Sequence, residues 1–305
     1  NSMAQHKKKY LDPEKLKQIG SLEIAARQVV EGLRIGSHKS PARGISSEFS
    51  AYRQYVAGDE TKHIDWKAYA RFNRYYIKQF DAETNFVANL LLDGSKSMTY
   101  GSNPNGLTKL EYAKFMAASL AYLTINQGDS AGVGMFDGEL SNYVNPKSSL
   151  SVLNDISDQM EKLEPRPRTN VGGILHDFAH RMTKRGFVML FSDLFDNIEE
   201  FMNGLSHLRY GGHNVILFHI LDDYELNFPL NGMWKFLGLE GEGELVTQPA
   251  RVRENYLKEL ERFVNEIKSA CAKNEVDYVL VNTKDPVEKT ISDYLLRRTA
   301  MAKSR

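Results

Sequence analysis

The stretch Leu90-Leu91-Leu92-Asp93-Gly94-Ser95-Lys96-Ser97-Met98 joins an apolar run to a carboxylate and two hydroxyls at alternate positions. The apolar run is typical of a buried parallel strand. Groups just past the carboxyl end of such a strand lie where doubly wound sheets bind ligands. Oxygen ligands of this type suit Mg²⁺ or Mn²⁺. The pattern Asp93-x-Ser95-x-Ser97 therefore predicts a metal site, the alternative being that both serines only make turn and cap hydrogen bonds.

Two further polar residues occupy similar places downstream. Thr169 stands in a loop just before a helical pattern over residues 171–183, and Asp193 ends the apolar run 187–192. Asp93 and Asp193 then end strands that flank the point where the strand order of the sheet reverses. The metal site predicted in this way consists of Asp93, Ser95, Ser97, Thr169 and Asp193.

Strand and helix patterns alternate along most of the chain. Apolar runs predict strands, and helical spacing between them predicts helices that cover both faces of a mostly parallel α/β sheet, doubly wound. Thr108 and Glu111 form a capping box that begins one helix. The run 140–144 is expected to return beside the strand 131–136, and residues 222–250 read as an insertion with a hairpin. We assign residues 85–303 to this domain.

Residues 1–84 form an extension with its own patterns. Asp12-Pro13 predicts the start of a helix that runs to about residue 35. Residues 75–80 resemble a strand, and we expect them to pair as a hairpin with the strand 86–92. The extension is therefore predicted to be a helix followed by a hairpin.

Composition excludes several classes of protein. The chain balances 39 basic and 39 acidic residues, so no global field favours nucleic acid, although residues 1–80 alone carry 15 basic residues against eight acidic ones. One cysteine, Cys271, fits a reducing compartment. No apolar run of membrane-spanning length and no apolar segment after the basic start are visible. We expect a cytoplasmic protein without membrane anchor or signal peptide.

Taken together, Asp93-x-Ser95-x-Ser97, Thr169 and Asp193 resemble the metal-ion-dependent adhesion site of von Willebrand factor type A domains. The resemblance implies that the three hydroxyls bind Mg²⁺ or Mn²⁺ directly, with the two aspartates around the ion. A carboxylate from a protein partner would complete the shell. An internal carboxylate, or a lysine such as Lys96, is the alternative occupant of the site in the resting protein.

A second set of motifs is similar to a bacterial family known as domain of unknown function 58. It includes Arg53-x-Tyr55-x-x-Gly58-Asp59, Ile64-Asp65-Trp66 and Ala70-Arg71, with later blocks around Ser192-Asp193-Leu194. The resemblance implies a von Willebrand type A domain with a family-specific extension, working with a MoxR-type AAA+ ATPase. Its implied role is an adaptor for protein–protein interaction and not an enzyme.

The segment that carries these motifs has two interpretations. Its charged and aromatic residues are either a partner surface or an internal clamp, in which Trp66 is buried and Arg53 pairs with Asp59 or Asp65. The residues concerned are Arg53, Tyr55, Asp59, Asp65, Trp66 and Arg71.

Two rival functions rest on other residues. Basic and aromatic side chains interleave over residues 62–78, as in surfaces that neutralise phosphates and stack bases, which favours nucleic-acid binding. His176 and His180, four apart with an acid after the first, resemble a zinc hydrolase pattern. However, Asp177 stands where that pattern has glutamate, and no clear third ligand is visible.

Overall fold

The computed structural model describes residues 47–55, 64–72, 74–82, 86–136, 140–166, 171–182, 185–195, 198–237 and 243–303. The chain divides into two compact units, one of residues 31–85 and one that contains residues 86–305. The helix predicted at residues 12–35 lies outside the described residues. Among the described residues, no helix is both long and apolar enough to cross a membrane.

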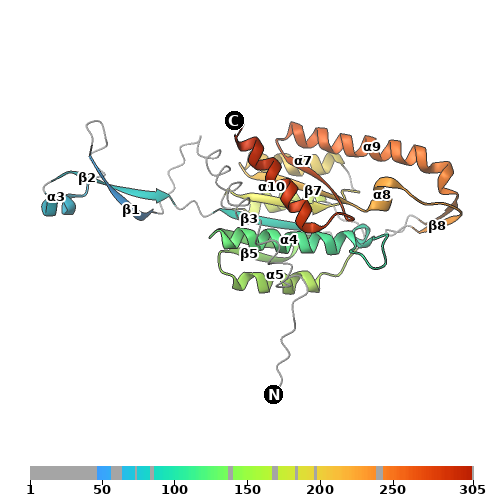
Figure 1. The fold of residues 1–305 in the computed structure, drawn as a ribbon, viewed down its shortest axis with the longest axis horizontal. Coiled ribbons are helices and arrows are strands. Elements are labelled where there is room, and N and C mark those ends of the chain that lie inside the picture. The colour runs from blue at the N-terminus through green and yellow to red at the C-terminus, as the bar shows by residue number, and fades with distance from the viewer. Residues whose placement is uncertain are drawn as a thin grey trace, which may run out of the picture. The chain divides into compact units, whose positions relative to one another are not determined.

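The larger unit is built on a six-stranded sheet with the order β10-β7-β6-β3-β4-β5 (Figure 1). Neighbouring strands are parallel except β4 and β5, which are antiparallel. The strands are β3 (Val87–Asp93), β4 (Ser130–Phe136), β5 (Leu140–Lys147), β6 (Phe187–Ser192), β7 (Asn214–Leu221) and β10 (Asp277–Asn282). The chain leaves β3 toward β4 on one side and reaches β6 on the other, so the strand order reverses at β3.

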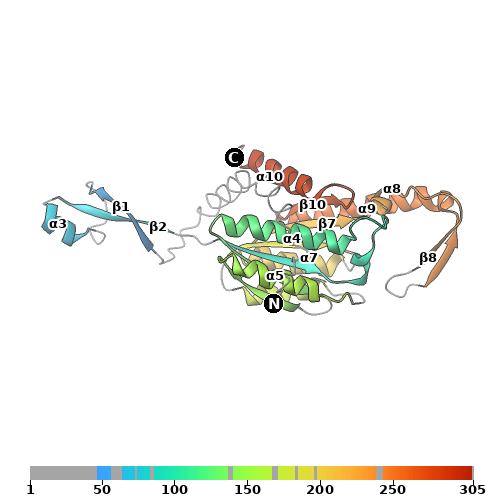
Figure 2. The same ribbon diagram turned by 60° about the horizontal axis from the view of Figure 1, so that its bottom comes forward.

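Helices cover both faces of this sheet, as Figures 1 and 2 show. Side chains from α6, α7 and α9 join one face of the strands in a continuous buried cluster that includes Phe178, Leu205 and Ile267. On the other face α4 packs with α5 and α10. These helices are α4 (Lys109–Asn126), α5 (Ser151–Lys162), α6 (Val171–Arg181), α7 (Ile198–Tyr210), α9 (Pro249–Lys273) and α10 (Val287–Lys303). The predicted α/β fold with a doubly wound, mostly parallel sheet is confirmed.

Helices α6 and α7 approach each other closely because glycines lie where they cross. A Cβ on Gly172 would lie 2.2 Å from the Glu200 carbonyl oxygen, and one on Gly204 would lie 2.7 Å from the Gly172 carbonyl oxygen. Any larger residue at either position would push the helices apart. The crossing therefore depends on the absence of side chains at these two positions.

The region between β7 and α9 holds short elements. They are the helix α8 (Asp223–Asn227) and the antiparallel strands β8 (Trp234–Leu237) and β9 (Glu244–Thr247). Asp222 caps α8 in a capping box with Glu225. This segment begins directly after the carboxyl end of β7, and it therefore starts at the same edge of the sheet as Asp93 and Asp193.

The smaller unit contains β1 (Ser47–Gln54), the short helix α3 (Trp66–Phe72) and β2 (Tyr76–Ala82). β1 and β2 are antiparallel. The predicted pairing of residues 75–80 with the strand 86–92 is wrong: β2 pairs with β1, whereas β3 is occupied on both sides by β4 and β6. A central strand of a sheet has no free edge for a further partner.

Candidate metal centre

The loop after β3 is held in place by backbone hydrogen bonds to two neighbouring segments. The Gly94 amide donates to the Phe136 carbonyl at 2.8 Å, at the end of β4. Lys96 donates its amide to the Arg166 carbonyl, and the Arg166 amide donates to Gly94, at 2.9 and 3.1 Å. These bonds place the residues after Asp93 at the edge where the strand order reverses.

Asp93 is a buried carboxylate bound only by neutral donors among the contacts described. Oδ1 accepts the Ser95 amide at 2.9 Å, and Oδ2 accepts the Ser192 hydroxyl at 2.5 Å. Burial, and then the nearby charge of the Asp193 carboxylate, raise the pKa of Asp93 to about 7. Without a further cation, an ionised Asp93 is therefore electrostatically unfavourable at this edge.

The hydroxyls of Ser95 and Ser97 face each other. Their Oγ atoms are 3.0 Å apart. Ser95 directly precedes the short 3-10 helix η2 (Lys96–Thr99), and it makes no cap hydrogen bond to that helix through its side chain. Two hydroxyls lie together next to a buried carboxylate.

Asp193 is a buried carboxylate bound by a cation. It follows β6, and Leu194 after it has a φ of 55°, a left-handed conformation that turns the chain sharply at this point. Its Oδ2 accepts a hydrogen bond from Lys109 Nζ at 2.8 Å. The same ammonium donates to Glu225 Oε1 at 2.7 Å. Asp193 and Glu225 thus share one buried lysine.

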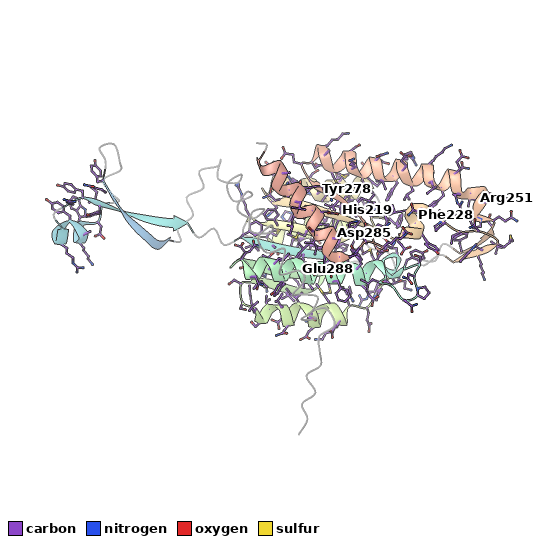
Figure 3. All side chains as sticks on the ribbon, in the orientation of Figure 1. His219, Phe228, Arg251, Tyr278, Asp285 and Glu288 are labelled. Atoms are coloured by element: carbon purple, nitrogen blue, oxygen red, sulfur yellow. The ribbon has the colours of Figure 1, made fainter. Side chains whose placement is uncertain are left out.

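The backbone of Asp193 is held by a buried histidine. His219 Nε2 donates to the Asp193 carbonyl at 3.0 Å, and Nδ1 therefore accepts from the Tyr278 hydroxyl at 2.9 Å. His219 and Tyr278 are labelled in Figure 3. Burial lowers the pKa of His219 to about 4, so the ring is neutral at neutral pH. This pair of bonds fixes the end of β6 relative to β7 and β10.

The structure brings four of the five predicted metal ligands to one edge: Asp93, Ser95, Ser97 and Asp193. Thr169 lies outside the described residues. Lys96 is exposed, whereas the lysine that contacts the site is Lys109. Within the described part of the chain, no three His, Cys, Asp or Glu side chains are grouped to hold a metal. The donor set at Asp93 is of another kind, two carboxylates with serine hydroxyls.

Four residues of this edge were not predicted from the sequence: Lys109, Ser192, His219 and Glu225. Ser192 ends the otherwise apolar strand β6, and His219 interrupts the apolar run of β7, and both positions were available signals. Lys109 and Glu225 carry no such signal. Lys109 is 84 positions from its partner Asp193 and 116 positions from its partner Glu225 in the sequence.

The clamp predicted in the smaller unit is wrong in one respect. Trp66 is 63% exposed instead of buried. Asp65 is buried and accepts the Lys67 and Ala68 amides at 2.9 and 3.2 Å, which caps α3. The pairing of Arg53 with Asp59 or Asp65 is untested, because Asp59 and the side chain of Arg53 lie outside what is described.

Aromatic rings gather around Trp66 in this unit. Tyr69 stacks on Tyr75 with ring centroids 4.5 Å apart, and Trp66 meets both rings edge-on. Tyr55 contacts Tyr75 in the same way. Because Trp66 and Tyr75 are exposed, this set is an aromatic surface and not a buried core.

The histidines of the zinc alternative form a chain of hydrogen bonds. His176 Nδ1 lies 2.7 Å from Nδ1 of His207 on α7, and its Nε2 lies 3.2 Å from His180 Nε2. His176 thus uses opposite ring nitrogens for its two neighbours. The three rings do not converge on one point, so this arrangement does not support the predicted zinc site.

Comparisons with known proteins give relatives of low identity. Uncharacterized proteins of Mycobacterium bovis and Mycobacterium tuberculosis are 22% identical over 223 residues, which cover 72% of this chain and 68% of theirs. Among solved structures, the chain is similar to the conserved hypothetical protein BatB from Bacteroides thetaiotaomicron (16% identity, 71% of this chain and 99% of that one, TM-score 0.46). A von Willebrand factor type A protein from Catenulispora acidiphila has 13% identity over 74% of this chain and 43% of that one, with a TM-score of 0.40.

A family model also matches the chain. It covers residues 51–264, which is more than half of the chain and spans both units. The chain belongs to the family described as Protein of unknown function DUF58.

Proposed function

We propose that this protein is a protein-interaction module whose binding depends on a divalent metal ion at Asp93. The observation that carries the proposal is the excess of buried negative charge at this edge of the sheet. Asp93, Asp193 and Asp222 are each at most 3% exposed, and Glu225 lies beside them. Among the described residues, one ammonium group, that of Lys109, contacts this set. A divalent cation would balance the remaining charge.

The donors present fit a small hard cation. Neighbouring oxygens around an octahedral Mg²⁺ at about 2.1 Å are separated by about 3.0 Å. The Ser95 and Ser97 hydroxyls are 3.0 Å apart. These two hydroxyls would hold Mg²⁺ or Mn²⁺ with Thr169, and Asp93 and Asp193 would lie around it. When bound, the ion would offer an open position to a carboxylate of a protein partner.

Other residues of the chain would orient the aspartates of the site. The Ser95 amide and Ser192 hydroxyl orient Asp93, while His219 fixes the backbone of Asp193. Neutral hydroxyl ligands leave a cation electron-poor, and it therefore attracts an incoming carboxylate. This is a mechanism of binding, and we propose no catalytic step.

Calorimetric titration of Mg²⁺ and Mn²⁺ into chelator-treated protein tests the proposal. We expect saturable binding in the wild type and its loss in Asp93→Ala and Thr169→Ala. Thr99→Ala is the matched control, because the Thr99 hydroxyl belongs to the same 3-10 helix but donates to the Lys96 carbonyl at 2.7 Å. Absence of binding in the wild type would contradict the proposal.

As partner we propose a MoxR-type AAA+ ATPase, in the cytoplasm, with this chain as its adaptor. The support is family membership, which brings the expected partnership with it. Immobilised protein should retain the purified ATPase of the same organism in Mg²⁺ and release it in chelator. Retention that is equal in Mg²⁺, in chelator and in Asp93→Ala would contradict a metal-dependent contact.

Nucleic-acid binding is the second candidate, and the aromatic surface of the smaller unit favours it. Trp66 and Tyr75 are exposed beside the exposed Lys67, Arg71 and Arg74, a mixture that suits stacking and phosphate contact. If this function holds, single-stranded DNA is retained in a salt-dependent manner that survives Asp93→Ala and is lost in Trp66→Ala. A DNA affinity unaffected by Trp66→Ala would contradict it.

A further inference from the structure

Lys109 occupies a place that ordinary helix chemistry disfavours for a lysine. It is the first residue of α4, where the helix dipole is positive and repels a cation. It is also 1% exposed, and burial opposes the charged form. An apolar side chain would avoid both penalties. Local preferences and the observed residue therefore disagree, which is typical of functional positions.

The two carboxylates of Asp193 and Glu225 offset these penalties. Lys109 Nζ lies 2.8 Å from the first and 2.7 Å from the second, and both charges act to raise its pKa. The rings of Phe195 and Tyr100 cover the ammonium at 5.1 and 5.8 Å from their centroids. The lysine is thus fixed as a cation and shielded from water.

This cation lies on one side of the proposed metal site only. Asp93 is bound by neutral donors, whereas Asp193 Oδ2 is already bound by Lys109. A divalent ion near Ser95 and Ser97 would therefore meet Asp93, which no cation of the described residues contacts, and Asp193, which Lys109 binds. The ammonium and the ion would also repel each other across Asp193.

We infer that Lys109 is an internal counter-cation that competes with the divalent ion for Asp193 and so sets the metal affinity of the site. The inference rests on the proposed function. Glu225 takes part as the second anchor of the ammonium: it holds Lys109 from the α8 side and draws it away from Asp193. Lys109 is a positioning residue in this account, since it acts on the metal through Asp193.

Two substitutions with opposite expected effects test this. Lys109→Met removes the competing charge and should tighten Mn²⁺ binding about tenfold or more. Glu225→Gln removes the second anchor, leaves the ammonium to Asp193 alone, and should weaken Mn²⁺ binding severalfold. Lys114→Met is the matched control: Lys114 is a buried lysine on the same helix, five residues further along and therefore on another face. It should leave the Mn²⁺ affinity unchanged.

The measurement is Mn²⁺ titration by calorimetry beside thermal unfolding in chelator. A purely structural ion pair predicts lower melting temperatures with unchanged Mn²⁺ affinity in both variants, and that result overturns the inference while the proposed function stands. Binding by Lys109→Met but not by the wild type supports the inference and contradicts metal dependence of the native protein. Absence of binding in every variant contradicts both. If Lys109→Met does not fold, Glu225→Gln decides, because weakening supports the inference and an unchanged affinity overturns it.

Discussion

Two buried aspartates lie at the same edge of the sheet, and they differ in the groups that donate hydrogen bonds to them. Asp93 receives an amide and a hydroxyl, whereas Asp193 receives the ammonium group of Lys109. Burial, followed by the charge of Asp193, raises the pKa of the Asp93 carboxyl to about 7, although the amide and the hydroxyl act to lower it. The difference indicates that Asp193 is completed by the protein itself, while Asp93 remains available to a cation from solution.

The largest expected effect separates the two aspartates by stability. Asp193→Asn removes one partner of a buried ion pair, and we expect it to lower the free energy of unfolding by about 3 kcal/mol. Asp93→Asn removes a charge that burial opposes, and we expect the free energy of unfolding at neutral pH to stay the same or to rise. Urea denaturation in chelator at neutral pH measures both. Equal losses would contradict the comparison.

A smaller effect concerns the Ser192 hydroxyl, which connects Asp93 to the chain segment that follows Asp193. Ser192 donates to Asp93 Oδ2 and accepts the Leu194 amide at 3.0 Å. Ser192→Ala leaves both groups without this partner, and we expect a loss of about 1–2 kcal/mol. Chemical denaturation gives the value, with Ser149→Ala as an exposed control in a serine–serine contact. A loss no greater than that of the control would show that the two hydrogen bonds of Ser192 do not stabilise this edge of the sheet.

The pH dependence of stability sharpens the contrast further. The raised pKa of Asp93 means that the folded protein holds this proton up to about pH 7, whereas the unfolded chain releases it near the ordinary value of 3.8. Stability from this group is therefore lost as pH rises between these values and through 7.

From pH 8 to pH 6, metal-free wild type should gain about 1 kcal/mol relative to Asp93→Asn. Denaturation curves at several pH values, all in chelator, provide the comparison. Parallel profiles for the two proteins would contradict an unpaired, buried Asp93.

The smallest effect distinguishes the two lysines of this region. Lys96 is exposed and lies in the hydroxyl-bearing loop, so solvent screens its charge. Lys96→Ala should change the free energy of unfolding by less than about 0.5 kcal/mol and the Mn²⁺ affinity by no more than about threefold. An effect as large as that of Lys109→Met would mean that long-range charge, and not contact with Asp193, governs the site.

Much of the fold could be predicted from sequence because its signals are local. Buried strands appear as apolar runs, and the capping box of Thr108 and Glu111 is present as expected. The meeting of Asp93 and Asp193 followed from strand order alone, since both end neighbouring parallel strands. The wrong prediction that residues 75–80 pair with residues 86–92 shows the limit of local signals, because the partner of a strand depends on which strand edges are already occupied.

The unpredicted part of the site depends on contacts between distant positions. In the sequence Lys109 is an ordinary polar residue in the first turn of a helix, and only the folded chain shows its contacts with Asp193 and Glu225. The clamp interpretation of the smaller unit requires a buried Trp66. Trp66 is instead exposed at the first position of α3.

The central claim is that a divalent ion binds on the Asp93 side while Lys109 keeps Asp193. Anomalous diffraction from crystals grown with Mn²⁺ tests it directly. We expect one peak within about 2.2 Å of the Ser95 and Ser97 hydroxyls, with Lys109 Nζ still bound to Asp193 or Glu225. A protein that crystallises with Mn²⁺ but shows no peak there, or shows one at His176 and His207 instead, would contradict the account.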